Sequence, residues 1–313
     1  MIPMLRLQFI IFTLIGIGFF TRKKGLVSRE GQKNITDLVI NIILPCNIVT
    51  SFTQELPDSA LRDCLMIFLI SVAAEALCML YAKYAYNNVT ENQKKCLTYG
   101  ILVSNAGFLG YPVAEGVYGP MGLMLASVYL IPVRIIMWSK GIAIFSGQSN
   151  RKDTLRKVIT HPCVVACLIG IFIMLTDLLA GIALIPDWLY EMLYTVGRCN
   201  TALSMMVIGM ILSDINLSEL VDKTVIRYTI DRLIIIPGVL GIILFVLYKC
   251  GIVSGLSPRL AVLLAAMPAA ATTSMLSSKY ECAPDFATKM VILSTLCSIP
   301  TIFVWGLLLK GAG

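Results

Sequence analysis

The sequence predicts an all-α membrane protein of about ten transmembrane helices, in an inverted repeat of five plus five with two broken helices that cross, spans four and nine. Three observations lead to this fold. The 313-residue chain is 58% hydrophobic and 14% charged, with a mean hydropathy of +0.84, whereas a soluble domain carries about 25% charged residues. Two polar interruptions lie in apolar stretches, and their prolines, Pro112 and Pro268, stand 156 residues apart, half of the chain. Alternate loops are basic.

The first half, residues 1–146, is expected to form five spans of about 20 apolar residues each. A proline in the sequence Leu44-Pro45 interrupts the second of these spans, and Gly119-Pro120 makes a tight turn between the fourth and the fifth. The five predicted spans run from about Met4 to Phe20 and over residues 35–52, 61–84, 94–118 and 121–145.

The second half, residues 158–313, follows a polar linker at 147–157 and repeats the plan of the first half. Glu75 and Asp231 are 156 residues apart, the same spacing as the two prolines. An odd number of spans in each half gives the two repeats opposite orientations in the membrane. The predicted spans are residues 158–176, 188–212, 224–248, 259–277 and 286–309.

The distribution of Lys and Arg predicts the orientation in the membrane. The second and sixth loops, residues 54–59 and 177–187, contain no Lys or Arg, whereas the first, third and fifth loops are basic. Basic loops stay in the cytoplasm. We therefore expect a multi-pass protein of the cell membrane with both termini outside. The basic cytoplasmic loops account for the net charge of +7, so no nucleic-acid partner is predicted.

The two interruptions, Ser104–Gly116 and Met267–Ser274, are expected to line a binding site. The first holds three glycines and a proline, and a proline removes a backbone donor and clashes with the preceding turn. Inside a bilayer, freed backbone groups are tolerated only where they face protein or a wet cavity. Paired interruptions in corresponding halves mark the binding site of many transporters.

A carboxylate suits this predicted site. Where two broken helices cross, the N-termini of the half-helices present free N–H groups and partial positive charge. Asparagine side chains add donors without a full charge. The alternative is that these residues hydrogen-bond one helix to another. The candidate substrate-binding residues are Asn105, Gly107, Gly110, Tyr111, Pro112, Asn47, Asn200, Pro268, Thr272 and Thr273.

Four charged residues fall inside predicted spans: Glu75, Asp231, Arg134 and Arg198. Each costs roughly 2.5–3.5 kcal/mol on insertion scales, so each is expected to be paired or functional. Glu75 or Asp231 is a candidate proton carrier. The alternative is a fixed ion pair, such as Asp231 with Arg134 or Arg198.

Neither a metal site, a cofactor nor an enzyme is predicted. The chain has ten cysteines without a CxxC motif and a single histidine, His161, which we place at a helix start before Pro162. No HExxH or GxGD motif is present, and no Ser/His pair lies near the interruptions. No soluble output domain is evident in 313 residues, which disfavours a receptor.

Five short motifs are spread over most of the chain: Leu44-Pro45, Asn105 to Pro112, Leu203 to Met210, Ala266 to Pro268 and Leu293 to Ile299. Together they resemble the auxin efflux carrier family, which includes bacterial malate and malonate permeases and, more distantly, the plant auxin exporters. The resemblance implies ten spans in an inverted repeat, a scaffold plus a moving unit, homodimers, and export or exchange of organic anions. Family members often carry a proline where this chain has Ala202, so we expect a softer break in span seven.

The sequence therefore predicts a secondary active carrier of small organic anions that works by alternating access around the crossing interruptions. A proton or sodium ion is the expected coupling ion. The alternative function is a sodium-coupled carrier of the bile-acid type, because Glu115, Thr272, Thr273 and Ser274 offer oxygen ligands near the interruptions.

Overall fold

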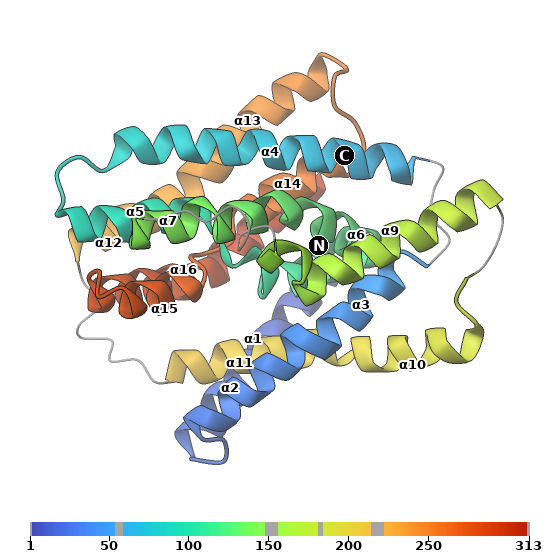
Figure 1. Cartoon of the computed structure of the whole chain (residues 1–313), viewed down its shortest axis with the longest axis horizontal. Helices are drawn as coiled ribbons and strands as arrows, with labels where there is room; N and C mark the ends of the chain where they lie inside the picture. Colours follow the sequence, from blue (N-terminus) through green and yellow to red (C-terminus); the bar gives the residue numbers. More distant parts are fainter. Residues whose placement is uncertain (1, 54–58, 148–155, 181–183, 214–221, 312–313) are drawn as a thin grey trace. The chain divides into compact units, whose positions relative to one another are not determined.

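The computed structural model describes residues 2–53, 59–147, 156–180, 184–213 and 222–311, and these residues form helices without a named strand (Figure 1). They divide into two compact units, and each unit takes segments from both halves of the chain. Unit 1 comprises residues 1–61, 111–128 and 159–215, and unit 2 comprises residues 62–110, 129–158 and 216–313. Most of the predicted linker at 147–157 lies outside the described residues.

Unit 1 is built around close helix pairs. Helix α1 packs along α11, and α3 packs against both α9 and α10. The sequence predicted the start of α9, where the Nδ1 atom of His161 accepts a hydrogen bond from the Cys163 amide at 3.3 Å. The elements are α1 (Ile2–Lys23), α2 (Arg29–Leu38), η1 (Val39–Ile43), α3 (Leu44–Ser51), α9 (Pro162–Ala180), α10 (Asp187–Gly197) and α11 (Cys199–Ser213).

Unit 2 contains the second predicted interruption and residues 104–110 of the first, whose remaining residues belong to unit 1. Its chain enters α5 through a capping box, in which Thr90 and Gln93 each bond the other's backbone amide. Its elements are α4 (Ala60–Ala85), α5 (Glu91–Leu102), η2 (Asn105–Gly107), α7 (Lys140–Ser146), α12 (Lys223–Ile230), η4 (Asp231–Ile235), α13 (Ile236–Lys249), α14 (Ser257–Ala265), α15 (Thr272–Lys279) and α16 (Pro284–Gly311).

Helix α6 (Gly110–Trp138) belongs in part to each unit and is two helices rather than one. At Gly119 the backbone takes φ 66° and ψ −162°, which lies outside the helical region and favours glycine. This is the tight turn that the sequence predicted at Gly119-Pro120.

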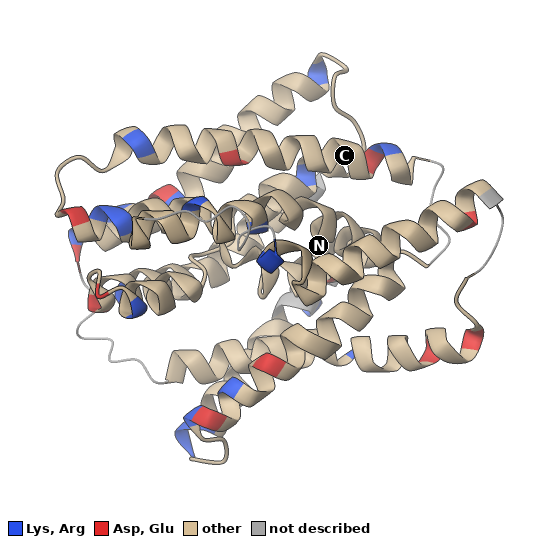
Figure 2. Cartoon of the chain, viewed as in Figure 1, with Lys and Arg blue, Asp and Glu red and all other residues tan. Residues whose placement is uncertain are grey.

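Seven helical stretches among the described residues are long and apolar enough to cross a membrane. Figure 2 shows that the long helices carry uncharged residues over most of their length. The predicted first, fourth and ninth spans are not in this count. The fourth and ninth fall short because each is interrupted: α5 has 12 residues, α14 has 9 and α15 has 8. Helix α1 covers the first predicted span.

The predicted interruption at Leu44-Pro45 is milder than a break. The five residues of η1 form a π-helical turn before Pro45, and the backbone at both ends of this turn stays helical. A wider turn accommodates a residue that cannot donate a backbone hydrogen bond. Span seven is also soft, as expected, since Arg198 between α10 and α11 keeps a helical φ of −59° and ψ of −23°.

Candidate functional site

Both predicted interruptions are true breaks in the helices of unit 2. Helix α5 ends at Leu102, and Val103 and Ser104 are extended before the short η2 turn at Asn105–Gly107. Helix α14 ends at Ala265, and α15 begins only at Thr272. Each break therefore leaves several backbone groups without the partners that a continuous helix would supply.

The two breaks supply those partners to one another. Ser104 and Ala269 form an isolated antiparallel bridge. The Asn105 amide donates to the Pro268 carbonyl at 2.8 Å, and the Ala270 amide donates to the Val103 carbonyl at 3.3 Å. The two segments, 165 residues apart in sequence, therefore lie side by side in unit 2.

This pairing corrects the expectation that the breaks offer free backbone amides. The amides of Asn105 and Ala270 are used by the bridge, and the Ala269 amide donates to the Ser294 hydroxyl at 3.2 Å. Helix α15 has no side-chain cap, and the Thr273 amide in its first turn donates to the Ala270 carbonyl at 2.9 Å. What remains for a ligand is the rest of that turn and the side chains around it. Donors at this place are therefore fewer than the sequence alone indicated.

Three candidate side chains lie at the breaks with different surroundings. The Asn105 side chain is half-buried and makes no hydrogen bond with any described residue. Thr273 is fully buried, and its hydroxyl has no partner within the described part of the chain. Thr272, in contrast, accepts a hydrogen bond from Tyr99 at 3.0 Å. Of these three residues, Asn105 is therefore the one whose side chain is both partly exposed and without a hydrogen bond to a described residue.

Of the two predicted glycines, Gly110 lies where the chain is crowded and Gly107 does not. A β-carbon at Gly110 would lie 3.0 Å from Leu264 and 3.4 Å from Met267, so Gly110 lets the two broken segments approach each other. A β-carbon at Gly107 would lie 3.6 Å from an amino nitrogen of Arg134. The buried guanidinium of Arg134, a predicted intramembrane charge, therefore lies against the first break.

Arg232 is a functional candidate that sequence reasoning missed. Its buried side chain donates from Nε to the Met267 carbonyl at 3.0 Å and from an amino nitrogen to the Ile101 carbonyl at 3.3 Å. One residue thus joins the end of α5 to the second break. Tyr228, one turn earlier, donates to the Gly100 carbonyl at 2.9 Å. The sequence shows only that Arg232 follows a charged residue in an apolar span, and the π-helical turn η4, which holds both, was not foreseen.

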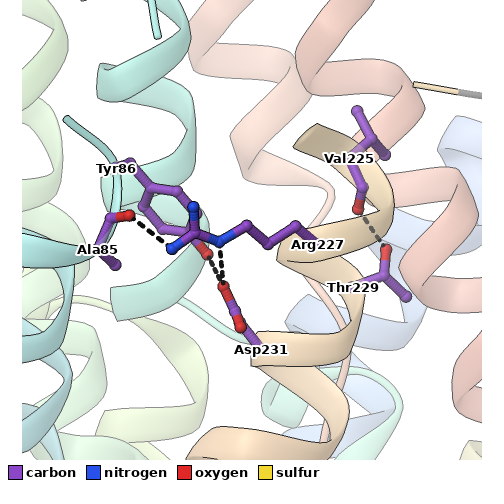
Figure 3. A network of polar contacts seen from close by, with 6 residues as sticks. All are labelled: Ala85, Tyr86, Val225, Arg227, Thr229 and Asp231. Atoms are coloured by element: carbon purple, nitrogen blue, oxygen red, sulfur yellow. Dashed lines mark hydrogen bonds and ion pairs between the residues drawn. The ribbon is translucent and has the colours of Figure 1, made fainter. Parts of the chain in front are cut away.

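The two matched carboxylates have different surroundings. Asp231 accepts a hydrogen bond from the Tyr86 hydroxyl at 2.8 Å and lies 3.8 Å from Arg227, which also donates to the Ala85 carbonyl at 2.9 Å (Figure 3). Figure 3 shows the Arg227 side chain reaching across to the end of α4. The partner of Asp231 is therefore an arginine four residues earlier, and not Arg134 or Arg198 as the sequence suggested.

Glu75 is buried and has an oxygen, Oε2, with no hydrogen-bond partner among the described residues. It lines a small cavity of about 10 Å³ with Ser104, Tyr129 and Arg232. A cavity of that size holds about one water molecule. The carboxylate thus faces the first break and the arginine that joins the two breaks.

The remaining candidates lie in unit 1. The Asn47 amide donates to the Glu115 carboxylate at 3.0 Å, and the Asn200 oxygen accepts from Ser204 at 3.2 Å. Tyr111 and Pro112 are buried at the start of α6.

Arg198 is exposed and lies over the Tyr194 ring, 5.6 Å from its centre. Its partner is therefore an aromatic ring and not the carboxylate expected. Within the described residues, no three His, Cys, Asp or Glu side chains gather as metal ligands would.

Comparison with known proteins places the chain among transporters. An uncharacterised transporter of Methanocaldococcus jannaschii is 25% identical over 319 residues, covering 99% of each chain. A second uncharacterised transporter, from Methanothermobacter thermautotrophicus, is 26% identical over 305 residues, covering 96% of each. The model of the family described as membrane transport protein matches residues 4–306. The chain is therefore a multi-pass member of the membrane transport protein family, the family of the auxin efflux carriers that its motifs resemble.

Proposed function

We propose that this transporter is a secondary active carrier of small organic anions, with carboxylates as the substrate class. It works by alternating access around the two paired breaks of unit 2. The observation that carries the proposal is the bridge between Ser104 and Ala269, with the unused side-chain amide of Asn105 beside it. Unwound segments next to half-helix N-termini are where secondary transporters hold anionic substrates.

The chemistry around the breaks supports an anion rather than a cation as substrate. Two buried arginines, Arg134 and Arg232, lie against the broken segments. The α15 N-terminus carries partial positive charge and has no side-chain cap. Asn105 adds an amide donor, and the pair of Thr272 and Thr273 adds hydroxyl groups.

The composition of the two units supports the inverted repeat, which is part of the same proposal. Unit 1 takes the first two predicted spans of each half, and unit 2 takes the third span of each half and the segments after it, apart from residues 111–128. Apart from residues 111–128, corresponding parts of residues 1–146 and 158–313 thus join the same unit. A carrier with a scaffold and a moving unit needs two such compact units. The proposal also includes location in the cell membrane, both termini outside the cell, and assembly as a homodimer.

Replacing Asn105 by alanine tests the assignment. When a panel of radiolabelled carboxylates is added outside proteoliposomes, we expect uptake by Asn105→Ala to fall at least about tenfold, because the variant lacks the side-chain amide that would hydrogen-bond the substrate. Asn88→Ala, at an exposed loop position, is the matched control and should transport normally.

Thermal stability separates a binding defect from a folding defect. A carboxylate that binds the folded wild type raises its melting temperature, and we expect this rise to vanish in Asn105→Ala while the melting temperature without ligand stays the same. Normal uptake by the variant would refute the assigned role of Asn105. A wild type that neither binds nor transports any carboxylate would refute the substrate class.

A further inference from the structure

The positively charged side chain of Arg232 lies between the C-terminal ends of two helices, α5 and α14. Ile101 is in the last turn of α5, and Met267 follows the last turn of α14. The carbonyls at the end of a helix lack intrahelical donors and carry partial negative charge. Arg232 donates to both of these carbonyls, at 3.3 Å and 3.0 Å. A single positive group therefore neutralises two helix ends that meet at the breaks.

Carbonyl oxygens at helix ends can also bind a small metal cation. In secondary transporters, unwound backbone carbonyls and the C-terminal ends of half-helices coordinate sodium ions. Here the buried Glu75 carboxylate lines the same cavity as Arg232 and has an oxygen without a hydrogen-bond partner among the described residues. Backbone carbonyls and carboxylates are hard oxygen ligands of the kind a small cation takes. In this chain a guanidinium bonds the two carbonyls, and the Glu75 carboxylate lines the cavity beside it.

We propose that Arg232 is a tethered cation that takes the place of a dissociable coupling cation behind the two breaks. The guanidinium keeps its charge at every physiological pH and presents several donors in a fixed plane. It can therefore hold both carbonyls throughout the transport cycle without an ion from solution. Two consequences follow: the protein needs no sodium, and loss of this side chain opens a site for a small monovalent cation.

Cation binding is tested without any transport assay, by following the melting temperature of detergent-purified protein in choline, sodium and low-millimolar guanidinium chloride. We expect the melting temperature of Arg232→Ala to rise by several degrees in sodium or guanidinium relative to choline, because these ions bind the folded state alone. Wild type should show no difference. A folded Arg232→Ala protein with the same melting temperature in all three salts would overturn the proposal.

Two further variants control this experiment. Arg227→Ala removes an arginine on the same helical stretch whose side chain is 60% exposed, and it should gain no response to cations. Arg232→Lys keeps the positive charge in the cavity and should also gain none. A cation response in Arg232→Lys equal to that of Arg232→Ala would contradict the role of the charge.

The transport consequence rests on the proposed function and is measured separately. Wild-type uptake should be equal in sodium and choline, and Arg232→Ala uptake should be at least about tenfold slower in choline than in sodium or guanidinium. If wild-type uptake or the wild-type melting temperature depends on sodium, the proposal that Arg232 replaces a coupling cation is wrong, even if Arg232→Ala does not fold. If no carboxylate is transported under any condition, the proposed function is wrong. The role of Arg232 is then still decided by the melting-temperature experiment.

Discussion

At the scale of single residues, side chains complete the hydrogen bonds that broken or proline-containing helices lose. Pro237 has no N–H group, so the Leu233 carbonyl lacks the donor four residues later. The Trp305 indole supplies it at 2.9 Å. Tyr228 and Arg232 do the same for the carbonyls of Gly100 and Ile101 near the end of α5. In these spans, polar side chains therefore donate hydrogen bonds to backbone carbonyls that have no backbone donor.

Trp305 provides a test of this principle. We expect Trp305→Phe to lower the free energy of unfolding by about 1–3 kcal/mol, because the Leu233 carbonyl is left without a donor. Trp188→Phe, at a side chain that is 67% exposed, should change stability little. Both are measured by thermal unfolding of the purified protein.

A double-mutant cycle makes the prediction specific. Pro237→Ala restores the missing amide, so Trp305→Phe should cost less in that background than in the wild type. Equal costs in both backgrounds would mean that Trp305 stabilises through packing alone.

The sequence predicted some residues well and others poorly, for a physical reason. Asn105 and the glycines around it stand out because polar and flexible residues are costly in an apolar span. Arg232 does not, because its importance depends on Ile101 and Met267, which are distant in sequence. Asp231 has partners of both kinds: the Tyr86 hydroxyl is 145 residues away, whereas Arg227 is only four residues earlier and was overlooked because a charge inside another span was expected.

At the scale of helices, a proline alone does not break a span. Pro45 and Pro237 follow π-helical turns within otherwise helical stretches. Pro112 lies in the first turn of α6, where a missing N–H costs nothing. The break itself is the segment from Val103 to Leu109, which has a paired strand-like partner in the second break. The proline therefore indicates roughly where the break lies. The length of the break is set by the hydrogen bonds between the two backbone segments.

Helix packing in unit 1 depends on glycine at one face of α1. A β-carbon at Gly18 would collide with the backbone of Met206 on α11, whereas one at Gly16 would meet nothing within 4 Å. We expect Gly18→Ala to lower stability by about 1–3 kcal/mol through overpacking.

Gly16→Ala is the control from the same helix. It should be neutral or stabilising by up to about 1 kcal/mol, because alanine is the better helix former. Thermal unfolding of both variants decides the matter, and equal melting temperatures would show that α1 shifts freely on α11.

At the scale of the whole molecule, each compact unit draws on both halves of the chain. Composition and hydropathy predicted an apolar, all-helical chain, and the matched prolines predicted where two helices break. The repeat boundaries at 146 and 158 remain predictions, because a compact unit is defined by contacts between distant segments and no local pattern encodes those contacts.

Membrane orientation is a testable property of the whole chain. With the N-terminus outside, the exposed Cys250 at the end of α13 faces the cell exterior. A membrane-impermeant thiol reagent should label it in intact cells, and Cys250→Ser should lose that label.

A cysteine introduced at exposed Lys24, in a Cys250→Ser background, reports on the first basic loop. It should react only after the membrane is permeabilised. The opposite pattern at the two positions would invert the predicted topology.

The bridge between Ser104 and Ala269 also bears on how the protein is made. Its two residues are 165 positions apart, so at roughly 5–20 residues per second the ribosome takes on the order of ten to thirty seconds to deliver the second one. Throughout that interval the first segment carries backbone groups that hydrocarbon will not accept. The nascent chain must therefore wait beside the insertion machinery or in a wet crevice, and the bilayer receives the finished segment only when its counterpart emerges.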